Sequence, residues 1–96
     1  MKRQPELKDW HIFFEVARQG SFNQAAAILG ISLAAVRRSI SGTEASTGVM
    51  LFERSHHRVI LTYAGCQLLN RLSPLINDIH DAVTRTVTAY GGTKRS

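Results

Sequence analysis

Residues 20 to 38 decide the fold, and they read GSFNQAAAILGISLAAVRR. Ser21 and Ser32 can each start a helix, because a serine hydroxyl accepts a hydrogen bond from a free backbone amide of the first helical turn. Gly30 lies between the two segments, where the chain needs a residue that tolerates a left-handed turn. Ile31 follows it and is expected to point inward as a plug. The stretch therefore predicts two short helices joined by a tight turn, over residues 22–29 and about 33–46.

A longer helix is expected upstream, over about residues 6–19, with Gly20 ending it. Apolar residues recur along it at helical spacing and form one stripe: Leu7, Trp10, Phe14 and Ala17, with Phe13 beside them. In the helix over residues 33–46, Val36 and Ile40 are expected to point inward. The aromatic side chains are assigned to the core rather than to base stacking: Trp10, Phe13, Phe14, Phe22 and Phe52.

The sequence pattern changes after Gly48. Two short β-prone runs, at residues 49–52 and 59–61, flank the polar segment ERSHHR at 53–58. This arrangement is typical of a two-stranded hairpin with a basic tip. Three helices followed by such a hairpin form a winged helix-turn-helix, so the predicted fold class is mainly α with a two-stranded wing.

A long C-terminal helix is predicted from Tyr63 to about residue 90, with Thr62 as its cap. Its apolar residues alternate at spacings of three and four, as in a coiled-coil seam: Leu69, Leu72, Ile76, Ile79 and Val83. We expect this seam to pair with a second copy, which makes the helix a dimerisation helix. The alternative that the seam packs on its own domain stays open. Pro74 either kinks the helix or starts a new one.

The charge of the chain favours a polyanionic partner. It has 12 Lys and Arg against 7 Asp and Glu, which gives a formal net charge of +5. Its length of 96 residues suits a single domain.

The longest apolar run, residues 25–31, is far shorter than the roughly 18 residues of a membrane span. The basic N-terminus is not followed by the apolar segment of a secretory signal. Cys66 has no partner for an internal disulfide and is expected to be a small core residue. A cytoplasmic protein without membrane contact is the default expectation.

A helix-turn-helix places its last helix in the major groove of DNA, which is about 12 Å wide. Residues in the first turns of that helix are expected to contact bases: Ser32, Leu33, Arg37 and Arg38. Backbone contacts are assigned to the start of the second helix and to the wing: Ser21, Asn23, Gln24, Arg54, His56, His57 and Arg58. The two adjacent histidines diverge on a hairpin tip and lack a nearby Cys or carboxylate partner, so phosphate contact is favoured over a metal site.

Four segments of the chain resemble the N-terminal domain of LysR-type transcriptional regulators: GSFNQAA at 20–26, LGIS at 29–32, GVMLFER at 48–54 and LTYAG at 61–65. The resemblance implies a bacterial regulator with a winged helix-turn-helix, a dimerising linker helix and a ligand-sensing domain of two α/β lobes. By this resemblance, residues 1–66 form the DNA-binding domain, 67–90 the linker helix and 91–96 a flexible tail. An effector ligand would bind the sensing domain, which these residues are expected to lack.

The third helix departs from the family's usual sequence. Where such regulators usually read SQPALSR, this chain reads SLAAVRR at residues 32–38. Leu33 replaces a base-reading Gln and Arg37 replaces a small hydroxyl residue, which leaves the target sequence open. Two usual core leucines become Thr43 and Thr47, and each Thr could donate a hydrogen bond to the carbonyl four residues earlier.

The leading hypothesis is therefore a dimeric, sequence-specific DNA-binding domain with double-stranded DNA as its partner and no cofactor. The alternative is a winged-helix module for protein–protein assembly whose basic face is incidental. Salt separates the two, because DNA binding releases counterions and weakens steeply as salt rises. An enzyme is not expected: no set of nucleophile and base can be assembled, and Cys66 and His80 would lie about 21 Å apart on one helix.

Overall fold

Local capping signals set the starts of the helices. The computed structural model describes residues 4–53 and 58–91, and these contain four helices: α1 (Leu7–Gln19), α2 (Phe22–Leu29), α3 (Leu33–Thr47) and α4 (Tyr63–Tyr90). The side chains of Ser21, Ser32 and Thr62 each accept a hydrogen bond from an amide in the first turn that follows, at 3.0, 3.0 and 2.9 Å. The predicted caps and helices are confirmed, and α3 ends one residue later than expected.

The turn between α2 and α3 has the geometry that the glycine at its centre predicts. Gly30 has φ 69° and donates its amide to Ala27 O at 3.3 Å, while the amide of Ile31 bonds Ala26 O at 3.1 Å. These two bonds form a Schellman ending. Ile31 itself is exposed, so the expectation that it plugs the core is wrong. Its amide is used to close the end of α2, which leaves the side chain at the surface of the turn.

The core lies where α1, α2 and α3 pack on one another and on the segment that follows α3. Its buried apolar residues come from all of these elements: Ile12, Phe13, Val16, Ala25, Ala26, Val36, Ile40, Leu51 and Phe52. The aromatic residues lie in or against this core as predicted, but Leu7 is 75% exposed. The prediction that Leu7 belongs to the apolar stripe of α1 was wrong. The buried face of this helix runs through residues 12, 13 and 16, and Leu7 lies before the part of the helix that packs on the core.

The predicted two-stranded wing is reduced, within the described residues, to a single antiparallel bridge between Phe52 and Leu61. Its hydrogen bonds run from Glu53 N to Ile60 O at 2.7 Å and from Thr62 N to Leu51 O at 3.0 Å. The backbone amides of Leu51 and Phe52 donate to the carboxylate of Glu44. They are therefore not available for the hydrogen bonds of a longer β-ladder. The wing tip, residues 54–57, lies outside the described residues.

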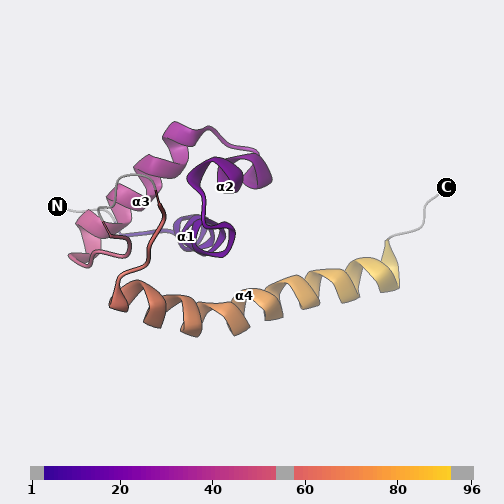
Figure 1. Cartoon of the computed structure of the whole chain (residues 1–96). Coiled ribbons are helices and arrows are strands. Elements are labelled where there is room, and N and C mark those ends of the chain that lie inside the picture. Colours follow the sequence, from indigo (N-terminus) through magenta and orange to yellow (C-terminus); the bar gives the residue numbers. More distant parts are fainter. Residues whose placement is uncertain (1–3, 54–57, 92–96) are drawn as a thin grey trace.

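Helix α4 runs unbroken through Pro74, which therefore does not start a separate helix. Figure 1 shows α4 passing beneath the three-helix group and extending beyond it, and its contact with that group is made through α1. Its 28 residues span about 42 Å at 1.5 Å per residue, close to the longest dimension of the described chain, 48 Å. The C-terminal half of α4 therefore presents its side chains to solvent.

No single helix in the described ranges is both long and apolar enough to cross a membrane. Taken together, α2 and α3 reach that length and composition only across a bend of 109°.

Candidate nucleic-acid interface

Helix α3 has one buried face and one exposed face, and the inner face fixes which residues point outward. Val36 and Ile40 are buried against the core as predicted. Arg37 and Arg38, which follow Val36 directly, are exposed on the other side of the helix. The phase of the buried residues therefore turns both guanidinium groups toward solvent in the first turns of α3.

The other two residues expected to contact bases lie at the start of α3. Ser32 is exposed, and its hydroxyl oxygen already accepts the amide of Ala35 at 3.0 Å. Leu33 is half-buried. The cap leaves Ser32 with its hydroxyl proton as a donor, whereas Leu33 offers only an apolar surface.

Arg37 lies over an aromatic ring of the neighbouring helix. Its Cζ is 5.1 Å from the centroid of the Phe22 ring, within the range of a cation–π contact. Arg38 borders a different hollow, of about 250 Å³, between α3 and the first turn of α1, which Lys8 and Asp9 also line. The two adjacent arginines are therefore held in different surroundings.

The start of α2 presents the candidate backbone contacts. Ser21 is half-buried and caps the helix by accepting the amide of Gln24 at 3.0 Å. Asn23 and Gln24 are exposed in its first turn. Exposed polar side chains beside the amides of a helix N-terminus suit contact with phosphate.

Of the four wing residues predicted to contact the DNA backbone, the structure describes one. Arg54, His56 and His57 lie outside the described residues, and Arg58 is exposed. Arg58 lines a cleft of about 220 Å³ that Arg37 and Glu53 also line. The structure therefore brings a cation of α3 and a cation of the segment between α3 and α4 to one cleft.

Glu44 also lines this cleft, and the sequence analysis assigned it no role. Its side chain is 5% exposed, and its Oε2 accepts the amides of Leu51 at 2.7 Å and Phe52 at 3.1 Å. The carboxylate thus ties the end of α3 to the start of the wing. The signal was present in the spacing, because Glu44 follows Val36 and Ile40 at intervals of four on the inner face of α3.

Asp9 is a second buried carboxylate that the sequence reading passed over. Its Oδ2 accepts the amide of Glu6 at 2.8 Å, and its Oδ1 accepts the hydroxyl of Ser39 at 2.7 Å. The first of these bonds caps α1 and the second joins α1 to the outer part of α3. Asp9 therefore helps to fix α3 relative to α1.

The two threonines of α3 differ from each other. Thr47 Oγ1 donates to Thr43 O at 2.8 Å, as predicted. The hydroxyl of Thr43 is buried and has no hydrogen-bond partner within the described part of the chain, so the same prediction was wrong for Thr43.

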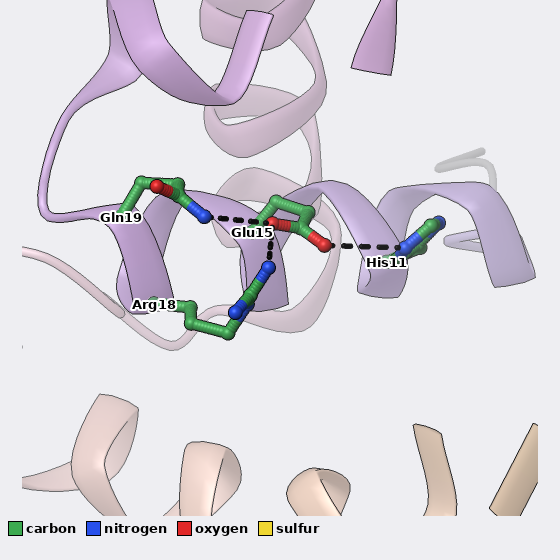
Figure 2. A network of polar contacts seen from close by, with 4 residues as sticks. All are labelled: His11, Glu15, Arg18 and Gln19. Carbon is green, nitrogen blue, oxygen red and sulfur yellow. Dashed lines mark hydrogen bonds and ion pairs between the residues drawn. The ribbon is translucent and has the colours of Figure 1, made fainter. Parts of the chain in front are cut away.

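A polar cluster on α1 surrounds the buried carboxylate of Glu15 (Figure 2). Arg18 Nη2 and Gln19 Nε2 each lie 3.4 Å from its Oε1, and His11 Nε2 lies 3.7 Å from its Oε2. All four residues belong to one helix, and the contacts satisfy the carboxylate locally. No group of three or more His, Cys, Asp or Glu side chains suited to a metal occurs in the described ranges.

Cys66 is exposed on α4, so its assignment to the core was wrong. The face of α4 that packs on the core runs through Gly65, Leu68, Leu69 and Leu72. Cys66 follows Gly65 by one residue, about 100° around the helix, which turns it away from that face.

The predicted seam of α4 is divided between two environments. Leu69 and Leu72 pack against the chain's own core, and Ile76 is only 8% exposed, so the expectation that Ile76 faces a partner is corrected. The reason is that α1 lies against this part of α4: Ile76, together with Trp10 and His11 of α1, lines an apolar groove of about 530 Å³ between the two helices. Ile79 and Val83 are 48% and 57% exposed.

The comparisons agree with this geometry. The family described as "Bacterial regulatory helix-turn-helix protein, lysR family" matches residues 7–66. The chain is 38% identical over 80 residues to the uncharacterized HTH-type transcriptional regulator YfeR of Shigella flexneri, covering 83% of this chain and 26% of that protein. The chain therefore spans about a quarter of the length of this curated relative.

Solved structures resemble the chain over nearly all of its length. The C206 mutant of OxyR from Corynebacterium glutamicum has a TM-score of 0.77 at 28% identity, covering 95% of this chain and 29% of that one. The BenM_DBD/catB site 1 DNA complex has a TM-score of 0.76 at 27% identity, covering 93% and 99%. The family matches more than half of the chain, and the outer face of the third helix of this helix-turn-helix is exposed, so the chain belongs to the LysR family of bacterial regulatory helix-turn-helix proteins.

Proposed function

We propose that the chain binds double-stranded DNA sequence-specifically, with α3 in the major groove and the wing on the sugar–phosphate backbone. The observation that carries the proposal is the outer face of α3, where Arg37 and Arg38 are exposed while Val36 and Ile40 anchor the helix. The net charge of +5 suits a polyanion. The similarity to a BenM_DBD structure solved with DNA supports the same conclusion. In the whole protein this binding would serve transcription regulation.

The direct test is selection of binding sites from a random DNA library, followed by titration of the selected site at several salt concentrations. We expect one enriched motif and an affinity that falls steeply with salt, because neutralised phosphates release counterions. Binding without enrichment would leave only nonspecific attraction. Affinity independent of salt would favour the alternative of a protein–protein assembly module.

Within this function we assign base contacts to Ser32, Leu33, Arg37 and Arg38, and backbone contacts to Ser21, Asn23, Gln24 and the wing. Arg37 is the residue that should set the preference of this chain, since its planar fork can donate to guanine O6 and N7 together. Leu33 can at best pack on a thymine methyl group. Arg58 lines the same cleft as Arg37, and we assign it to a phosphate.

Replacing Arg37 with alanine should weaken binding to the selected site by about 1–3 kcal/mol and relax the choice of base at one position. Arg58→Ala is the matched control: it should weaken binding to all sequences alike and flatten the salt slope by about one unit. Fluorescence anisotropy across all single-base variants of the site measures both effects. A uniform loss for Arg37→Ala would assign Arg37 to a phosphate instead.

We also propose that the exposed C-terminal part of α4 pairs two copies of the chain. Ile79 lines the groove between α1 and α4 and is still 48% exposed. Val83 continues the apolar seam at 57% exposure, and Val87 and Tyr90 extend it at 50% and 87%. A two-fold pair would present two copies of α3 to half-sites one helical turn, or a multiple of it, apart.

The double variant Val83→Asp with Val87→Asp should shift the chain from dimer to monomer, because it places charges in the apolar seam. Ile76 is left intact, since it is buried within its own chain and its loss would test folding instead. Arg85→Asp, about 200° around the helix from Val83, changes the net charge by the same two units and should leave the dimer unchanged. Analytical ultracentrifugation at tens of micromolar decides. A monomeric wild-type chain would refute the pairing.

A further inference from the structure

Three phenylalanine rings lead from the centre of the core to the proposed DNA-contacting face. Phe13 is fully buried, and its ring centroid lies 5.4 Å from that of Phe52. The ring of Phe52 meets that of Phe22 edge-to-face at 6.0 Å. Phe22 is partly buried against the core, and Cζ of Arg37 lies 5.1 Å from the centroid of its ring. The series therefore ends on the residue to which we assign base recognition.

The position of Phe22 is fixed from two sides. It is the first residue of α2, directly after the cap that Ser21 provides. Its ring is also held by Phe52, which is 6% exposed and forms the bridge to Leu61 at the base of the wing. A ring held in this way can constrain a long side chain that lies on it.

A guanidinium over a ring uses its planar face for that contact and keeps its N–H edges free. Those edges are the groups that would donate to a base, so the ring contact and base recognition do not compete. An arginine that is already ordered loses less conformational freedom when it binds than one that is free in solvent. The contact should therefore favour binding wherever Arg37 makes its DNA contact.

We propose that Phe22 is a positioning residue for Arg37: its ring preorders the guanidinium that contacts DNA. The inference rests on the proposed function and goes one step beyond it, because Phe22 itself need not touch DNA. The contact also gives the long side chain of Arg37 on α3 a packing partner, which is the Phe22 ring of α2.

A double-mutant cycle tests the proposal. Phe22→Leu should weaken binding to the selected site about two- to fivefold in the wild-type chain, the range expected for a cation–π contact at a surface. The same change should have no further effect in the Arg37→Ala background, and its full effect in the Arg38→Ala background, which is the matched control. Phe22→Tyr keeps the ring and should restore most of the affinity. Equal losses in the Arg37→Ala and Arg38→Ala backgrounds would overturn the proposal by assigning Phe22 a purely structural role.

A measurement on the free protein tests the ring contact separately from DNA binding. In the nuclear magnetic resonance spectrum, the side-chain protons of Arg37 should show an upfield ring-current shift that Phe22→Leu removes and Phe22→Tyr retains. Absence of this shift in the wild-type chain would overturn the contact itself. If the shift is present but no salt-dependent DNA binding occurs, the proposed function fails and the positioning role fails with it. Binding without coupling to Arg37 refutes the positioning role alone.

Discussion

Replacing Gly65 with alanine should lower the free energy of unfolding by about 3 kcal/mol, at the upper end of the cost of overpacking a tight site. Gly65 is buried in the first turn of α4, and an added Cβ would clash with the backbone carbonyl oxygen of Leu51 and lie 2.9 Å from Leu61 Cδ2. The Leu51 carbonyl cannot move freely, because it accepts the amide of Thr62 at 3.0 Å. The start of α4 would have to separate from the base of the wing.

Gly42→Ala is the matched control for this change. Gly42 lies inside α3, and an added Cβ there meets no atom within 4 Å. The substitution should raise the free energy of unfolding by about 0.5–1 kcal/mol, since alanine is the better helix former. Urea unfolding followed by circular dichroism, at one fixed protein concentration, measures both variants. Equal midpoints for the Gly65 variant and the wild type would contradict the close approach of α4 to Leu51.

Loss of the Glu44 carboxylate should be the other large effect, with Glu44→Ala lowering the free energy of unfolding by about 3–4 kcal/mol. Two buried amides, those of Leu51 and Phe52, lose their acceptor, and each unsatisfied group costs about 1–3 kcal/mol. Glu44→Gln keeps one carbonyl oxygen in place and should cost less than Glu44→Ala. Glu53→Ala removes an exposed carboxylate nearby and should stay within about 0.5 kcal/mol of the wild type.

Hydrogen exchange locates the effect of Glu44. The amides of Leu51 and Phe52 should exchange faster in Glu44→Ala than in Glu53→Ala, while amides inside α1 change little below global unfolding. Urea unfolding gives the total free energy. Identical stabilities for the alanine variants at 44 and 53 would show that the carboxylate does not hold the base of the wing.

Much of the candidate interface was predictable because it depends on one helix at a time. The spacing of Val36 and Ile40 along the chain is enough to turn Arg37 and Arg38 outward. The contact between Arg37 and Phe22 was not predictable in this way, because it joins two helices and depends on the angle at which α2 and α3 cross. The same holds for Ser39 and Asp9, whose hydrogen bond joins residues 30 positions apart.

The sequence by itself determined where α2, α3 and α4 begin and where α2 ends. Ser21, Ser32 and Thr62 bond amides three residues away, and Gly30 adopts a conformation that depends on its own backbone, so these signals act locally. The tertiary structure alone decided which surfaces are covered. Ile76 is buried because α1 reaches it, Cys66 is exposed because Gly65 takes the inner face of α4, and Glu44 binds the wing amides because α3 ends beside them. Whether a residue is buried depends on how far a neighbouring helix extends along its own helix. The spacing of residues within one segment does not encode that extent.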